Sequence, residues 1–243
     1  MRRPALTCSM VLLTSGAQAA DISFATESYP PYTYQTEDGS IDGAGAAQVR
    51  AMMAGVGADV EYRIDIMPWA RALALAQTQS TSCVFAAART PERETTFQWV
   101  VPMLMDVNLI VARQSSSITA TTIAEALLYS VGTQREDYTE GLLRRAGFER
   151  LDLSASFDLT LAKLLGGRID LMAISQDVYD RLVREHVPIR RIVVLSMQQL
   201  GIACNPALPP ALIARMQSRS TASARRASRI AYSNATGCRR CAE

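Results

Sequence analysis

The sequence has few residues able to bind a metal or to act as a catalytic base. It contains one His, His186, and one Lys, Lys163, among 243 residues. Its five Cys residues do not form two C-x₂-C pairs, so we expect no zinc site. His186 lies at the end of a predicted helix, away from the predicted loops, which argues against a Ser-His-Asp set. We therefore predict a protein without metal, cofactor or enzyme activity.

Long apolar runs and a strong charge excess are also missing. No segment reaches about 18 uninterrupted apolar residues, so we expect no membrane-spanning helix in the mature chain. The net charge of +2 gives no electrostatic basis for binding nucleic acid. Hydrophobic residues make up 49% and charged residues 20% of the chain, which indicates a packed globular fold.

Residues 1–19 have the pattern of a removable signal peptide. Arg2 and Arg3 precede a short apolar stretch at 5–13, and residues 17–19 (Ala-Gln-Ala) provide a small-x-small cleavage site. The alternative interpretation is a buried N-terminal helix. We predict export to the periplasm, an oxidising compartment where disulfides persist. Four Cys residues follow the signal and allow three pairings.

Two series of alternating strands and helices follow the signal. The first predicts a parallel sheet with crossover helices, from strands at 22–26, 60–64 and 82–87 and helices at 44–56 and 68–77. A strand at 107–112 and three consecutive Ser residues separate it from the second series. The second has strands at 129–133, 151–153, 169–174 and 192–195, and helices at 138–146, 158–165 and 176–185. A strand at 200–204 and a helix from about residue 211 come last.

Two such series joined by extended segments predict two lobes with a cleft between them. We expect the chain to cross near 112–115 and near 197–200. Lobe 1 then comprises residues 20–112 plus 200–243, and lobe 2 comprises residues 113–199. Periodicity alone does not establish that the last strand returns to lobe 1. The Ser- and Arg-rich segment 218–243 is either a disordered tail or contains a docked helix at 222–232.

A cluster of charges follows the third strand, in the run Arg89-Thr90-Pro91-Glu92-Arg93. Ligands of open α/β sheets bind beyond the carboxyl ends of the strands. A guanidinium there can hold a carboxylate through two parallel hydrogen bonds. The alternative for Arg93 is a surface salt bridge with Glu92 or Glu94, and Arg89 can equally point into the cleft or brace the loop.

With Phe97 and Trp99, this run resembles the ligand-anchoring segment of family 3 extracellular solute-binding proteins, of the polar amino-acid binding type. Segments 24–32 and 68–72 resemble the family's two cleft loops, and segments 131–133, 163–170 and 201–203 follow in family order. The resemblance covers about residues 21–215. It implies a type II periplasmic binding protein-like α/β fold, with a mostly parallel sheet flanked by helices in each lobe and two hinge crossings. It also implies a monomer that closes over a small ligand and delivers it to the membrane permease of an ABC transporter.

By the resemblance, Arg93 grips the α-carboxylate of an amino acid. Two of the partners that the family usually offers such a ligand are absent. Ala88 stands where a Ser or Thr is usual, and Ser175 stands where an Asp usually receives the α-ammonium group. Glu27, at the end of the first strand, could hold a cationic group instead, or it is a solvated loop acid or helix cap.

Aromatic residues at loop positions are further candidates for the cleft. Tyr29, Tyr32 and Trp69 fall outside the apolar periodic faces, so we expect them to enclose a ligand, with core packing as the alternative for Trp69. Arg71 either reaches the cleft or caps the lobe.

The loop at 134–138 is the corresponding candidate in lobe 2. It contains Arg135 and Tyr138, and its backbone N–H groups can hold an anion. The family tends to have Gly where Glu136 stands, so the resemblance does not determine the shape of this loop. If Cys83 and Cys204 both belong to lobe 1, neighbouring strands would bring them within reach of a disulfide.

The predicted function is the binding of a small polar solute, an amino acid or a related carboxylate or amine. One alternative is a ligand-sensing subunit without transport. Another is a dehydratase-like enzyme on the same scaffold, in which Glu27 and Asp177 would form an acid–base pair.

Overall fold

The computed structural model describes residues 20–221. The predicted signal peptide and the tail from residue 222, with its Cys238-x-x-Cys241 spacing, lie outside the described residues. Residues 218–221, which the composition placed with the tail, continue a helix that begins at residue 210. None of the helices within residues 20–221 is both long and apolar enough to cross a membrane.

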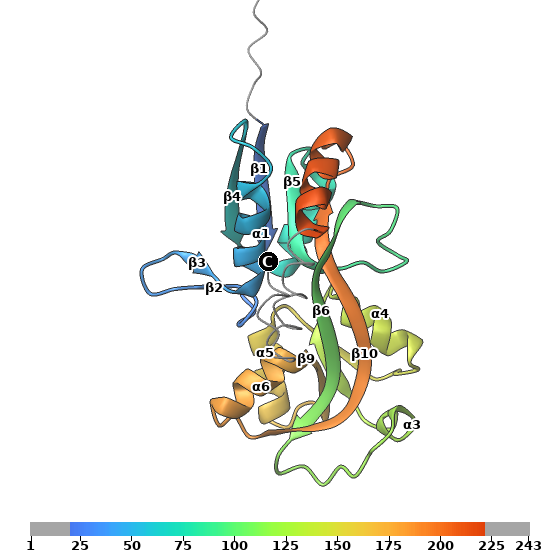
Figure 1. Ribbon diagram of the computed structural model, residues 1–243. Coiled ribbons are helices and arrows are strands. Elements are labelled where there is room, and N and C mark those ends of the chain that lie inside the picture. Colours follow the sequence, from blue (N-terminus) through green and yellow to red (C-terminus); the bar gives the residue numbers. More distant parts are fainter. Residues whose placement is uncertain (1–19, 222–243) are drawn as a thin grey trace, which may run out of the picture.

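The described chain forms two lobes joined by two long paired strands (Figure 1). In lobe 1, β1 (Ala20–Thr26) pairs in parallel with β4 (Val60–Ile66) and with β5 (Ser82–Ala88). In lobe 2, β7 (Val131–Gln134) pairs in parallel with β8 (Leu151–Ser154) and with β9 (Leu171–Ser175). The antiparallel strands β6 (Gln98–Arg113) and β10 (Ile189–Cys204) run between them, so the strand order is β4-β1-β5-β10-β6-β9-β7-β8.

Both connecting strands are longer than the sequence pattern predicts. β6 begins at Gln98, where we expected no strand before 107, and β10 unites the two strands expected at 192–195 and 200–204. Pro102 explains part of the difference, because it lacks the N–H that a regular ladder needs, and the register shifts opposite it. β10 also pairs with β5, so the last strand does return to lobe 1. The lobe boundaries at 112 and 200 stay a prediction, since β6 and β10 belong to both lobes.

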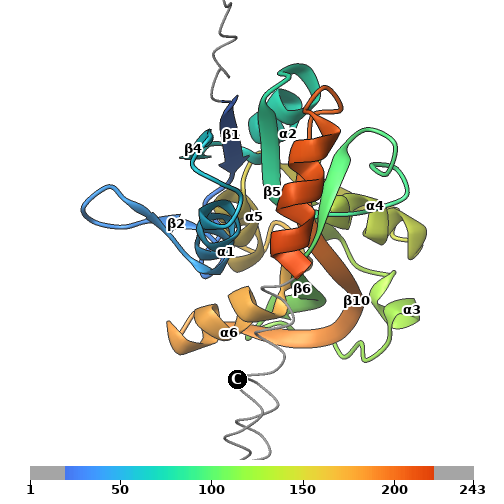
Figure 2. The ribbon, with the colours of Figure 1, turned by 45° about the horizontal axis from the view of Figure 1, so that its top comes forward.

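Helices cover both faces of the sheet in lobe 1. Successive residues of a strand point to opposite faces. Phe24 therefore packs in the core that contains side chains of α1 (Ala44–Ala54), whereas Ala25 packs in the core that contains those of α2 (Trp69–Thr78). The helix at 210–221 lies over lobe 1 (Figure 2), with Met216 in the same core as Phe24. A short hairpin of β2 (Tyr34–Gln35) and β3 (Ile41–Asp42) extends from this lobe.

Lobe 2 repeats this arrangement with α4 (Tyr138–Arg145), α5 (Phe157–Leu165) and α6 (Gln176–Arg184), and with the short α3 (Ile123–Ala126). Each of the three longer helices begins directly after a strand of the sheet or after a short turn that follows one. Asp137 caps α4 by accepting a hydrogen bond from the N–H of Thr139, and Ser156 caps α5 through Leu159. The helix N-termini of lobe 2 therefore face the same edge of the sheet as the strand ends.

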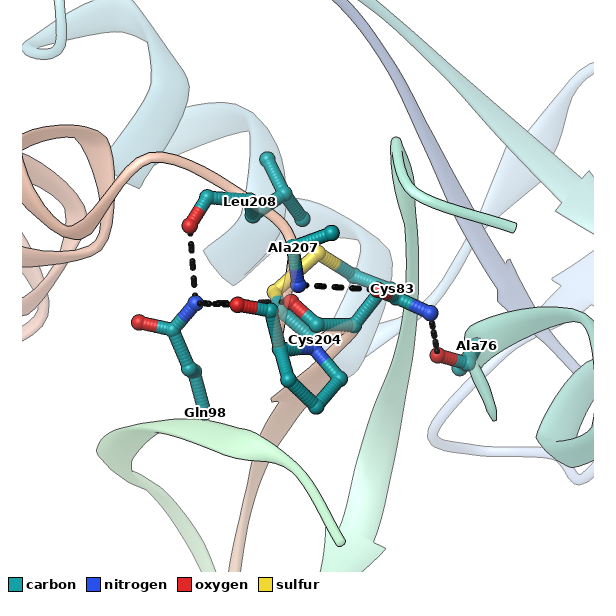
Figure 3. Close-up of a disulfide and its surroundings, with 8 residues drawn as sticks. Ala76, Cys83, Gln98, Cys204, Ala207 and Leu208 are labelled. Atoms are coloured by element: carbon teal, nitrogen blue, oxygen red, sulfur yellow. Dashed lines mark hydrogen bonds between the residues drawn. A yellow bond between two sulfur atoms is a disulfide. The ribbon is translucent and has the colours of Figure 1, made fainter. Parts of the chain in front are cut away.

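The Cys83–Cys204 disulfide predicted for lobe 1 is present in the structure (Figure 3). It joins β5 to the end of β10, where the two residues face each other in the antiparallel ladder. Gln98 of β6 donates hydrogen bonds nearby, to the backbone carbonyls of Pro206 and Leu208. The returning strand is thus fixed to lobe 1 by a covalent bond and by its neighbours.

Candidate functional site

Loops from both lobes meet beside β6 and enclose a cavity of about 60 Å³. Its walls come from the carboxyl ends of β1, β7 and β9 and from the start of α2, as expected for an open α/β sheet. The residues predicted as ligand contacts divide into two groups. Six of them line the cavity, namely Glu27, Tyr29, Tyr32, Trp69, Tyr138 and Ser175. The other five do not, namely Arg71, Ala88, Arg89, Arg93 and Arg135.

Arg93 lies at the outer rim of the cleft, where it joins the two lobes. Its Nη2 donates a hydrogen bond to the backbone carbonyl of Glu136 at 2.6 Å, and its guanidinium lies 5.6 Å from the ring centroid of Trp69. Trp69 Nε1 donates to the same carbonyl at 3.0 Å. Neither Glu92 nor Glu94 forms an ion pair with Arg93 in the described chain, because they pair with Arg145 and Arg89 respectively. A backbone carbonyl therefore takes one of the guanidinium donors that were expected to hold a ligand carboxylate, and Nη1 of Arg93 has no partner within residues 20–221.

The other four residues have local reasons for lying outside the cavity. Arg89 is exposed and braces its own loop through Glu94. Arg71 on α2 and Arg135 after β7 are also exposed. Ala88 is fully buried in the ladder, opposite Leu200 of β10.

Glu136, whose carbonyl accepts both bonds, has an unusual backbone conformation. Its φ is +62°, in the left-handed region that favours Gly. A non-Gly residue in this region costs about 1–2 kcal/mol. The same residue accepts both hydrogen bonds from lobe 1, so the strained backbone lies at the contact between the lobes.

Asp106 is a buried member of the site that our sequence reasoning missed. It is 2% exposed and accepts hydrogen bonds from the hydroxyls of Tyr138 and Ser175 (2.8 Å), and the hydroxyl oxygen of Tyr32 lies 3.4 Å from its carboxylate. Asn108, which is 1% exposed, lies two residues further along β6 and also faces the cavity. Two polar residues with a spacing of two inside an apolar run place both on one face of a strand. That spacing could have identified both residues from the sequence. The strand that we predicted began at residue 107 and so left out Asp106.

The carboxyl groups of the cavity have raised pKa values. Burial raises the pKa of Glu27 from 4.5 to about 7, helped by the charges of Asp137 and Asp158 and opposed by a 2.7 Å hydrogen bond from Gln134. Burial likewise raises the pKa of Asp106 and of Asp137. The pKa values of Tyr29, Tyr32 and Tyr138 also rise through burial, so these hydroxyls stay protonated and can donate.

Two buried polar groups that line the cavity have no partner within residues 20–221. They are Nδ2 of Asn108 and Oγ1 of Thr33, each on a side chain that is 1% exposed. A buried donor or acceptor without a partner costs about 1–3 kcal/mol. Both groups would recover that free energy by hydrogen bonding to a ligand.

Protein groups alone already hold the lobes together around the cavity. Tyr32 donates a hydrogen bond to Asp177 at 2.9 Å, and Tyr29 donates to Ser175 at 3.3 Å. Arg181 of α6 donates to the carbonyl of Pro30 at 3.1 Å. The structure therefore represents a closed arrangement of the two lobes.

Two arrangements considered from the sequence are not assembled within residues 20–221. No group of three or more His, Cys, Asp or Glu residues within 20–221 is placed to hold a metal ion. Glu27 lines the cavity but Asp177 does not, so the acid–base pair considered for a dehydratase is not assembled. What the arrangement can do is surround a small molecule with carboxylates, hydroxyls and aromatic rings.

Comparison with known proteins gives one family and many similar folds. The model of bacterial extracellular solute-binding proteins, family 3, matches residues 22–191. No curated protein matches the chain. Among solved structures, a histidine kinase sensor domain similar to periplasmic binding proteins has a TM-score of 0.77 at 16% identity, covering 88% of this chain and 94% of that one.

Two further structures have the same fold. The holo form of ArgBP from T. maritima has a TM-score of 0.73 at 18% identity, covering 83% of this chain and 89% of that one. The ancestral amino acid-binding protein AncCDT-1, a precursor of cyclohexadienyl dehydratase, has a TM-score of 0.71 at 16% identity, covering 85% and 90%. At these identities the likeness concerns the fold.

Proposed function

Because the chain belongs to the bacterial extracellular solute-binding proteins of family 3, we propose that it binds a small polar solute in the cavity between its two lobes. The observation that carries this proposal is that both lobes line one enclosed cavity. Glu27 and Tyr29 contribute from lobe 1, and Gln134 and Ser175 contribute from lobe 2. A molecule in this position contacts both lobes, so it favours the closed arrangement by its differential affinity.

The proposed ligand contacts are the residues that line the cavity. They include the six sequence-predicted residues together with Asp106, Asn108 and Gln134. Arg93 supports the closed form from the rim through Glu136. The solute is an amino acid or a related carboxylate or amine.

We further propose that the mature protein acts in the periplasm as a monomer and delivers its ligand to the permease of an ABC transporter. A sensing role without transport is the second candidate, since a histidine kinase sensor domain has the same fold. Uptake of labelled ligand by cells that lack the gene distinguishes the two roles. Transport predicts lost uptake, whereas sensing predicts unchanged uptake and a lost cellular response.

Calorimetric titration against amino acids, organic cations, carboxylates and sugars tests solute binding itself. The matched variants are Ser175→Leu, which fills the cavity, and Ser115→Leu on an exposed loop. We expect at least one compound to bind the wild type and Ser115→Leu, and none to bind a folded Ser175→Leu protein. Absence of binding across the panel, or full binding by Ser175→Leu, would contradict the proposal.

A further inference from the structure

The charge balance of the cavity points to the class of ligand. Glu27, Asp106 and Asp137 line it, whereas none of its described lining residues is Lys, Arg or His. Burial of these carboxylates is costly and raises their pKa values; the charge of Arg93, outside the cavity, offsets part of this cost for Asp137. A positive group in the cavity would offset this cost, and a negative group would add to it.

The helix N-termini around the cavity do not reverse this balance. A helix N-terminus carries a partial positive charge that can attract an anion. In lobe 2, however, each helix has its own carboxylate at that end. Asp137 caps α4, Asp158 lies in the first turn of α5, and Asp177 lies in the first turn of α6. Of these three carboxylates only Asp137 lines the cavity, so an anionic ligand would meet a protein carboxylate at the start of α4. The start of α2, which also lines the cavity, has no acidic residue in its first turn.

The guanidinium that would bind a carboxylate lies outside the cavity, and one of its nitrogens, Nη2, is engaged by the backbone of lobe 2. Arg93 donates to the carbonyl of Glu136, stacks on Trp69 and lines an outer groove instead of the cavity. Asp137 and Tyr138 line both spaces and so stand between them. Nη1 of Arg93 has no partner within residues 20–221, but a carboxylate held inside the cavity is separated from it by Asp137 and Tyr138.

Unpartnered groups indicate a second feature of the ligand. Nδ2 of Asn108 is a donor without a described partner, and it lies near Asp106 because the Tyr138 hydroxyl contacts both side chains. An acceptor at Asn108 that carried a negative charge would be repelled by Asp106. A neutral oxygen, such as a hydroxyl, suits this position.

The volume of the cavity and its aromatic walls limit the size and the type of ligand. The cavity of about 60 Å³ is less than half of the ~150 Å³ apolar cavity that accepts benzene. It therefore has room for a head group of only a few heavy atoms while the lobes are closed. Tyr29, Tyr32, Tyr138 and Trp69 supply ring surfaces, and such surfaces attract organic cations.

We propose that the ligand is a compact organic cation without a carboxylate, of the amino-alcohol type, whose positive nitrogen lies against Glu27 and whose neutral oxygen accepts from Asn108. This inference rests on the proposed function and names the ligand class for the same cavity. It departs from an α-amino acid in one respect, because it requires no anionic end. Arg93 then contributes by joining the lobes through Glu136.

Matched probes that differ in one group test this inference. Ethanolamine is compared with glycine, so that only one member of the pair has a carboxylate. 1-Propanol, the uncharged carbon isostere of ethanolamine, tests the need for charge. We expect ethanolamine to bind at least about tenfold more tightly than each of its counterparts, a ratio that corresponds to about 1.4 kcal/mol.

Two variants connect the preference to the cavity. Glu27→Gln should lose about tenfold or more in affinity for the cation while keeping its hydrogen bond with Gln134, whereas Glu61→Gln on the exposed face of β4 should bind as the wild type does. Tighter binding of glycine or a sugar, or equal binding of 1-propanol, overturns the inference and leaves solute binding intact. Equal losses in both variants also overturn it. If no compound of the wider panel binds, both the inference and the proposed function fail.

Discussion

Replacing Glu27 by Gln should stabilise the protein at alkaline pH and leave it unchanged in acid. The pKa of Glu27 is about 7 in the fold, against 4.5 as its ordinary value. Between these two values the folded protein keeps a proton that the unfolded chain has released, so the free energy of unfolding falls as the pH rises through this window. Above pH 7 the full cost of the buried charge is present. Glu27→Gln removes this cost and keeps an acceptor for Gln134.

The magnitude follows from the size of the shift. A difference of about 2.5 between the two pKa values corresponds to about 3 kcal/mol at 1.36 kcal/mol per unit. Opening of the lobes lets water reach Glu27, so this figure is a ceiling. For a protein of this size each kcal/mol raises the melting temperature by about 2–4 °C. We therefore expect Glu27→Gln to melt at least about 2 °C above the wild type at pH 8.

Thermal unfolding followed by circular dichroism at pH 4.5 and pH 8 provides the measurement. The groups that act on Glu27 are Gln134, Asp137 and Asp158 of lobe 2, and the substitution leaves all three in place. Glu61→Gln is the control, because Glu61 is exposed on β4. A variant that melts below the wild type at pH 8, or that gains as much at pH 4.5, would refute the reasoning.

Three other variants test separate parts of the structure. Arg93→Ala removes a charged hydrogen bond to Glu136 worth about 1.5–3 kcal/mol, so the ligand-free variant should have a larger radius of gyration than the wild type by X-ray scattering. The control Arg89→Ala removes a contact within one loop and should leave the radius of gyration unchanged. Identical scattering of both variants would contradict this role for Arg93. The double variant Cys83→Ala/Cys204→Ala removes the disulfide between residues 121 apart in the sequence, so chemical denaturation should show that the free energy of unfolding falls by about 2–5 kcal/mol. An unchanged denaturation midpoint would contradict a stabilising role for the disulfide. Glu136→Gly removes the cost of the left-handed backbone at φ +62° and should raise the melting temperature by the equivalent of about 1 kcal/mol. A melting temperature below that of the wild type would show that the conformation carries no cost.

The order of strands and helices was predictable because periodic patterns reflect which face of each element is buried. The predicted helix at 138–146 corresponds to α4, and the strand at 82–87 to β5. The extents of β6 and β10 were not predictable in the same way. Pro102 interrupts the apparent strand, and partly exposed residues of β10 hide its alternation. What keeps these strands continuous is their pairing with each other, which sequence periodicity does not express.

The sequence predicts a site residue correctly where the order of strands and loops fixes its place in the fold. It does not predict the direction in which a side chain points. Residues at strand ends, such as Glu27 and Ser175, had to lie at the same edge of the sheet. Arg93 lies at that edge too, but its guanidinium turns to a carbonyl of lobe 2. That contact depends on the left-handed conformation of Glu136, and the sequence offered only the family's preference for Gly as a hint.

A crystal structure with the tightest-binding compound of the calorimetric panel tests the central claim most directly. We predict that the compound occupies the cavity between the lobes, with its cationic nitrogen within hydrogen-bond distance of the Glu27 carboxylate and the Arg93–Glu136 contact intact. A compound bound outside this cavity would contradict the claim that the lobes close over their ligand there. A ligand carboxylate on the Arg93 guanidinium, in place of the Glu136 carbonyl, would contradict the proposed ligand class.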